Sequence, residues 1–161
     1  MELGPGTAIG LPELVLQTQQ WVERIGRAAL KPSQKVEILT RYAIPRLLYQ
    51  LDYGQAGVTL LNRIDLVIRG AVKRWLHLPP STTDGLLYSR YKDGGLNISK
   101  LARQVPCIQA RRVFRLRRSE DPLTRLATTS LFPREKFECL WLSAGGLLEQ
   151  VPDLEEQSSE A

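Results

Sequence analysis

A long apolar stripe at helical spacing lies in residues 58–76 and constrains the fold more than any other feature. Its apolar members are Leu60, Leu61, Ile64, Val67, Ile68, Ala71, Val72, Trp75 and Leu76. This period predicts one amphipathic helix that buries a single face against other elements. The opposite face carries Asp65 and Arg69, four residues apart and in the favourable order for a surface ion pair. Pro79-Pro80 ends the predicted helix.

Weaker helical patterns flank this element and make the expected fold mainly α. Residues 14–29 and 36–51 have apolar side chains at helical spacings, and Pro45 falls inside the second pattern. Because proline lacks a backbone donor and clashes with the preceding turn, we expect a kink or break near residues 42–44.

The second half of the chain alternates loop signals with helical ones. The Gly94-Gly95 pair predicts a turn with positive φ. Ser99 is the expected N-cap of a helix that runs to about Arg118, where Pro106 can interrupt it. Asp121-Pro122 predicts a further helix start, with the acid in a capping role.

These patterns divide the chain into five segments. We expect a disordered N-terminus in 1–10, a helical bundle in 11–78, an irregular connector around 79–98, a basic helical linker with a C-terminal helix in 99–149, and an acidic disordered tail in 150–161. The chain lacks an apolar run long enough to span a bilayer and a signal-peptide pattern, so no membrane partner and an intracellular location are expected.

Several kinds of catalytic site find no support in the sequence. Cys107 and Cys139 lack metal-ligand spacing and share one histidine, His77, for which a helix-end role is expected. The acids of the basic part are mostly scattered singly, whereas a polymerase centre needs carboxylates that hold two divalent metals. We therefore expect no catalytic residue, metal site or cofactor in this chain.

The charge of the chain is unevenly distributed. Residues 1–132 carry 20 Lys and Arg against 10 Asp and Glu, whereas residues 133–161 carry 2 against 7. Residues 94–119 contain no acid. Arg111, Arg115 and Arg118 would share one side of a helix, which could follow a phosphate backbone and make binding salt-sensitive. A solvated helix face explains the arginines as well, and the missing acids favour a ligand.

Short motifs in a fixed order resemble the thumb and linker of reverse transcriptases from site-specific non-LTR retrotransposons. The motifs are Trp21-Val22-Glu23-Arg24-Ile25, Leu30-Lys31-Pro32-Ser33-Gln34-Lys35, Ile44-Pro45-Arg46-Leu47-Leu48-Tyr49, Val72-Lys73-Arg74-Trp75-Leu76-His77-Leu78-Pro79, Gly94-Gly95-Leu96-Asn97-Ile98, Arg111-Arg112-Val113-Phe114-Arg115-Leu116 and Ser119-Glu120-Asp121-Pro122. The resemblance covers roughly residues 11–130. It departs at both ends, since the start does not look like palm sequence and an acidic tail replaces the expected Cys/His cluster.

The resemblance implies a fragment that holds nucleic acid. A thumb clamps the primer–template duplex, and the linker contacts the element's RNA or target DNA, so the implied partners are RNA, an RNA–DNA hybrid and target DNA, in the nucleus. The catalytic palm with its divalent metals, and a zinc knuckle with an endonuclease, belong elsewhere in such proteins. Packing against that palm is a further implied contact. The candidate nucleic-acid-binding residues are Arg69, Lys73, Arg74, Lys100, Arg103, Arg111, Arg112, Arg115 and Arg118.

Two alternatives remain open beside the thumb/linker hypothesis. The chain is one piece of a polymerase with endonuclease, or it is a helical protein-interaction domain derived from such an element. In the second case Trp21, Trp75 and Trp141 are core or contact aromatics, and the basic row binds an acidic tail.

Overall fold

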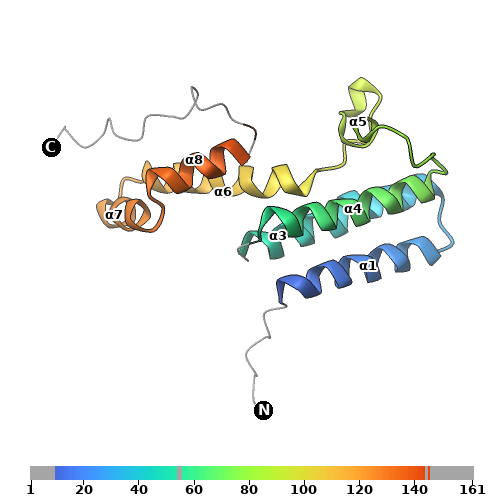
Figure 1. Ribbon diagram of the computed structural model, residues 1–161, viewed down its shortest axis with the longest axis horizontal. Coiled ribbons are helices and arrows are strands. Elements are labelled where there is room, and N and C mark those ends of the chain that lie inside the picture. The colour runs from blue at the N-terminus through green and yellow to red at the C-terminus, as the bar shows by residue number, and fades with distance from the viewer. Residues whose placement is uncertain (1–9, 54–55, 144, 146–161) are drawn as a thin grey trace, which may run out of the picture. The chain divides into compact units, whose positions relative to one another are not determined.

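The computed structural model describes residues 10–53, 56–143 and 145, and this part of the chain is helical with no strand (Figure 1). The prediction of a mainly α fold is confirmed. The elements are α1 (Leu11–Arg27), α2 (Pro32–Ile38), a π-helical turn (Leu39–Ala43), α3 (Ile44–Tyr53), α4 (Val58–Trp75), α5 (Asp84–Tyr88), a 3-10 turn (Tyr91–Asp93), α6 (Leu101–Arg117), α7 (Pro122–Leu131) and α8 (Arg134–Ser143). The acidic tail 150–161, and the N-terminus before residue 10, lie outside the described residues.

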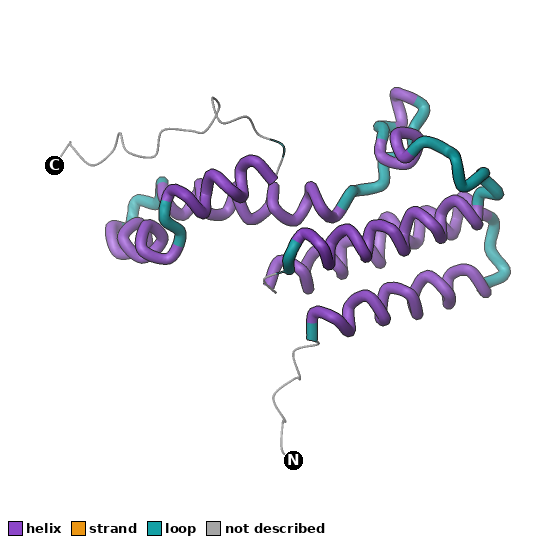
Figure 2. The backbone as a smooth tube through the Cα atoms, viewed as in Figure 1, coloured by secondary structure: helices purple, strands orange, loops and turns teal. Residues whose placement is uncertain are grey.

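The chain divides into two compact units, Met1–Leu101 and Ala102–Ala161. In the first unit α1 packs along α4, and α2, the π turn and α3 follow one another as a continuous helical rod (Figure 2). The core of this bundle consists of buried aliphatic side chains from these helices: Leu14, Val22, Val36, Leu39, Ile44, Leu47, Leu51, Leu61, Ile64, Ile68 and Val72. The stripe of residues 58–76 therefore forms one wall of this core, as its period predicts.

The π turn of the first unit is the distortion that Pro45 predicts. The Ile44 N–H donates to the Leu39 carbonyl five residues earlier, instead of to the residue four earlier. Pro45 has no N–H to donate, and its ring would crowd the carbonyl of Arg41 in a regular helix. One wide turn relieves that clash and lets the rod continue without a break.

Helix α4 ends in a Schellman motif with a histidine in the left-handed position. The Leu78 N–H donates to the Lys73 carbonyl at 2.8 Å, and the His77 N–H donates to the Arg74 carbonyl at 3.2 Å. His77 has φ of 53° and is exposed. This geometry satisfies the last carbonyls of the helix and gives His77 the helix-end role expected from the sequence.

We expect the His77→Gly variant to be more stable than the wild type by about 0.5–1 kcal/mol, because glycine adopts positive φ without steric cost. Urea unfolding followed by circular dichroism measures the difference. His77→Ala is the matched control, since it removes the same imidazole but keeps a Cβ. Equal stability of the glycine and alanine variants would contradict the backbone explanation.

The connector around residues 79–98 is more ordered than its composition indicates. It contains the short helix α5 and the 3-10 turn, and the chain then folds back along α5. The backbone N–H groups of Leu96, Asn97 and Ile98 donate to the carbonyls of residues 86, 89 and 87 at 2.8–2.9 Å. Leu87 and Ile98 are buried, so this return segment belongs to the packed part of the first unit.

The second unit consists of α6, α7 and α8 around a small core. Ala110 and Val113 of α6 pack with Phe137 of α8, and partly buried apolar residues surround them. Helix α7 begins at the predicted position, where the Asp121 carboxylate accepts hydrogen bonds from the N–H groups of Leu123 and Thr124. Pro106 is buried inside α6 and does not interrupt it.

Candidate nucleic-acid interface

The arginine row predicted for residues 111–118 lies on α6 and the residue that follows it. Arg111, Arg112, Arg115 and Arg118 are all exposed. The guanidinium of Arg118 lies 4.6 Å from the ring centroid of Phe114, one turn earlier. Such stacking holds a guanidinium in place without neutralising its charge.

Arg117 has a different role from these neighbours. Its guanidinium donates to the Phe132 carbonyl and lies 5.9 Å from the ring centroid of Phe137. Burial lowers the pKa of Arg117, and the nearby charge of Arg134 lowers it further. Arg117 thus links α6 to the core of the second unit, and it is not one of the predicted contact residues.

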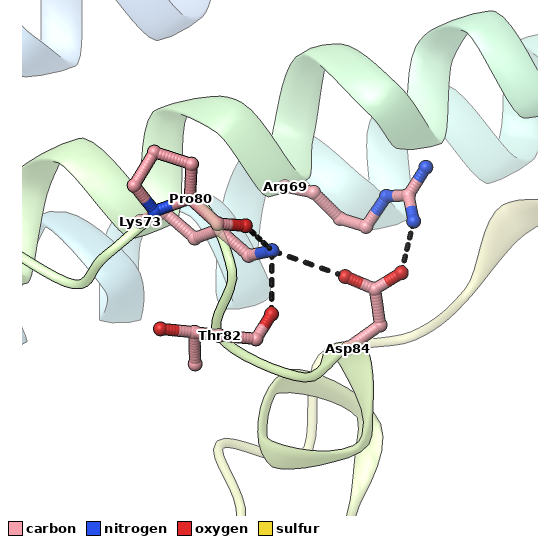
Figure 3. A network of polar contacts seen from close by, with 5 residues as sticks. All are labelled: Arg69, Lys73, Pro80, Thr82 and Asp84. Carbon is pink, nitrogen blue, oxygen red and sulfur yellow. Dashed lines mark hydrogen bonds and ion pairs between the residues drawn. The ribbon is translucent and has the colours of Figure 1, made fainter.

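Arg69 and Lys73 at the C-terminal half of α4 are engaged with the connector (Figure 3). The Arg69 guanidinium forms an ion pair with one oxygen of Asp84, and the Lys73 ammonium lies 3.3 Å from the other. The same ammonium donates to the carbonyls of Pro80 at 3.2 Å and Thr82 at 2.7 Å. Only 16% of the Lys73 side chain is exposed. Its ammonium N–H groups therefore stabilise the contact between α4 and the connector.

The charges of Arg69 and Lys73 are balanced in part by this carboxylate. Desolvation alone would raise the pKa of Asp84, but hydrogen bonds from Lys73 and Arg69 outweigh it and leave the pKa below its ordinary value. Asp84 therefore stays ionised at neutral pH. Arg74, which is exposed and donates to the Gly70 carbonyl, is the predicted contact residue of α4 that this carboxylate does not engage.

The prediction of a surface ion pair between Asp65 and Arg69 is wrong. Asp65 is only 3% exposed, and its carboxylate accepts a hydrogen bond from the Leu101 N–H at 2.8 Å. Leu101 is the first residue of α6. The acceptor that caps this helix start is therefore a side chain of α4 and not the predicted Ser99. Arg69 pairs with Asp84 instead. Asp65 and Arg69 both lie on α4, and each has its partner on a different element.

Lys100 and Arg103 flank the start of α6, and both are exposed. The Lys100 ammonium lies 5.9 Å from the ring centroid of Tyr88. Burial, with a contribution from the charge of Asp65, raises the pKa of Tyr88 to about 12. The Tyr88 hydroxyl therefore stays neutral at physiological pH, and its ring supports the lysine through a cation–π contact.

The described residues contain no group of three or more His, Cys, Asp or Glu that could hold a metal ion. None of their helices is long and apolar enough to cross a membrane. Cys107 is half-buried and Cys139 is exposed, and both are free thiols.

Trp21, Trp75 and Trp141 are all partly buried. The Trp75 indole lies over Gly26, where an added Cβ would come within 3.1 Å of its nitrogen. Trp141 stacks on Phe137 with ring centroids 6.1 Å apart. Trp75 and Trp141 thus contribute to packing, in line with the interpretation of the tryptophans as core or contact aromatics.

The fold and the site define a basic helical module, and comparison with known proteins places it among retrotransposon polyproteins. The chain is 37% identical over 109 residues to a Pol polyprotein from the type-1 retrotransposable element R2 of Popillia japonica, an alignment that covers 68% of this chain and 15% of the relative. A second such polyprotein of that species is 36% identical over 123 residues, which cover 76% of this chain and 27% of the relative. The R2DM polyprotein of Drosophila melanogaster is 32% identical over 96 residues, or 60% of this chain and 9% of the relative.

The resemblance to non-LTR retrotransposon polyproteins is thereby confirmed. The chain is homologous to a segment of the R2 Pol polyproteins and matches a fragment of such a protein. It aligns with less than a third of the length of these relatives. No family model matches the chain.

Proposed function

We propose that this chain is a thumb/linker module that holds primer–template or element RNA and is not catalytic by itself. The observation that carries the proposal is the exposure of Arg111, Arg112, Arg115 and Arg118 within an acid-free stretch. The kinship to R2 Pol polyproteins supports nucleic acid as the ligand. In the whole protein, an RNA-directed DNA polymerase with an endonuclease would supply the chemistry, the divalent metals and the palm against which this module packs.

The spacing of the row suits a phosphate backbone. A helix rises 1.5 Å per residue, so Arg111 and Arg118 lie about 10 Å apart along the axis of α6. That length corresponds to roughly three nucleotides of one strand, at about 3.4 Å of rise each. Arg103, Lys100 and Arg74 extend the candidate contact set, whereas Arg69 and Lys73 would first have to leave Asp84. Because target DNA lies in the nucleus, we expect the module to act there.

Salt dependence tests the proposal directly. Binding of the full chain to a labelled RNA–DNA hybrid, measured by fluorescence anisotropy, should weaken roughly 40- to 150-fold between about 50 and 200 mM salt if three or four phosphates are contacted. The expected result arises because each neutralised phosphate releases counterions. Absence of binding at low salt, or affinity independent of salt, would overturn the proposal.

A charge-matched pair of variants locates the contact. We expect Arg111→Gln, Arg115→Gln and Arg118→Gln together to lower hybrid affinity roughly tenfold or more and to reduce the salt slope by about 2 to 3. The control combines Arg27→Gln, Arg41→Gln and Arg63→Gln, which removes three exposed helical arginines from the first unit. Equal losses in both variants would show that net charge, and not the row on α6, determines binding.

A further inference from the structure

A shallow groove on the first unit combines aromatic and cationic side chains. Its volume is about 250 Å³, and its walls come from α1, α2, the π turn and α3. The lining residues are Trp21, Arg24, Ile25, Ile38, Tyr42, Ala43 and Arg46. None of these residues is acidic, so the groove presents two arginines and two aromatic rings without a carboxylate to balance the charge.

The π turn places the aromatic side chain at this groove. Tyr42 lies inside the turn that Pro45 causes, and it is 71% exposed although it lines the groove. π-helical turns inside α-helices occur frequently at functional sites, because the wide turn redirects side chains at some cost in stability. The buried residues of the same turn, Leu39 and Ala43, hold the turn against the core.

The opposite wall, formed by α1, supplies a second ring and one of the two arginines, and α3 supplies the other arginine. Trp21 of α1 is partly buried, and the guanidinium of Arg46 lies 5.3 Å from the Trp21 ring centroid. Arg24, one turn after Trp21, is exposed beside it. An arginine that stacks on a tryptophan keeps its edge N–H groups available to an anion.

We propose that this groove binds one unpaired nucleotide of a single strand, with its base against Tyr42 and Trp21 and its phosphate at Arg24 and Arg46. The volume is below the roughly 300–1,000 Å³ of sites that enclose drug-sized ligands, and it suits one planar ring. Two unbalanced arginines favour a phosphate over an apolar peptide side chain, which would leave both charges without a partner. The inference takes nucleic acid as ligand from the proposed function, but it does not involve the arginine row of α6.

The test uses the full chain and a labelled single-stranded oligouridine. Because base–aromatic stacking contributes strongly to single-strand binding, Tyr42→Ala should lower oligouridine affinity roughly 5- to 100-fold, whereas Tyr42→Phe should stay within about twofold of the wild type. Affinity for a fully paired hybrid should not change. Tyr91→Ala, which removes a tyrosine that is 68% exposed and does not line the groove, is the matched control.

Each outcome separates this site from the arginine row. Unchanged oligouridine affinity in Tyr42→Ala would overturn the nucleotide proposal and leave a protein segment as the occupant. Equal losses for single strand and hybrid would overturn it as well. If Tyr42→Ala leaves oligouridine affinity unchanged while the triple arginine variant lowers hybrid affinity, only the nucleotide proposal is overturned. If the triple arginine variant leaves hybrid affinity unchanged while Tyr42→Ala lowers oligouridine affinity, only the proposed function is overturned. Because Tyr42 is exposed, we expect Tyr42→Ala to stay folded, and circular dichroism of the variant checks this.

Discussion

The Gly95→Ala variant is expected to lose about 3 kcal/mol or more of unfolding free energy, the largest effect of any single methyl group considered for this chain. A Cβ at this position would lie 2.2 Å from the carbonyl oxygen of Ser89 and 2.5 Å from its carbonyl carbon. These are backbone atoms, so no side-chain rotation relieves the overlap. The backbone must move, and the hydrogen bonds of residues 96–98 to the α5 segment are the first to weaken.

Two other glycines control for the general effect of adding a methyl group. Gly70 lies inside α4 with nothing within 4 Å of an added Cβ. Gly70→Ala should therefore stabilise the chain by about 0.5–1 kcal/mol through helix propensity. Gly94 also has open space but a φ of 78°, so Gly94→Ala should cost only about 1–2 kcal/mol. Urea unfolding of the three variants checks the order, and a Gly95 variant no less stable than the Gly94 variant would contradict the close approach to Ser89.

The Asp65→Ala variant is expected to lose about 2–3 kcal/mol, since hydrogen bonds to charged groups contribute about 1.5–3 kcal/mol and an unsatisfied buried donor adds a cost. The substitution removes the carboxylate that accepts the Leu101 N–H at 2.8 Å. Leu101 is fully buried, so water cannot easily replace the lost acceptor. Alanine has the higher helix propensity, which makes the measured loss a lower bound on the contribution of the cap.

Asn62→Ala provides the comparison for Asp65. Asn62 lies three residues earlier on the same helix and is exposed, so its replacement should leave stability unchanged or slightly raised. Unfolding in urea measures both variants, and Asp65→Asn should fall between them because it keeps an acceptor oxygen without the charge. An Asp65→Ala variant as stable as the wild type would refute the role of Asp65 in capping α6.

Local sequence patterns predicted the elements of this fold well. The apolar period of residues 58–76 gave α4 to within one residue of its observed end at Trp75. Pro45 predicted the distortion in the second helical pattern, and Asp121-Pro122 predicted the start of α7. These features succeed because each depends on interactions between residues only a few positions apart.

Partners distant in the sequence were not predictable in the same way. Asp65 and Arg69 stand four apart, and helix spacing alone pairs them, yet Asp65 caps Leu101, 36 residues away, and Arg69 pairs with Asp84, 15 residues away. The candidate groove has the same character, because only packing brings Trp21 of α1 beside Arg46 of α3.

The sequence by itself therefore determined that this protein is helical, where its helices bend and begin, and that residues 94–119 carry positive charge without acids. Helix periodicity, proline geometry and charge are properties of the chain before it folds. The tertiary structure decided which basic side chains of the chain remain exposed. Arg111, Arg112 and Arg115 of α6 face solvent. Arg117 instead donates to the Phe132 carbonyl, and Asp84 engages Arg69 and Lys73. The physical reason is that a charge binds whatever partner the fold brings within a few ångströms, and sequence spacing fixes that distance only within one element.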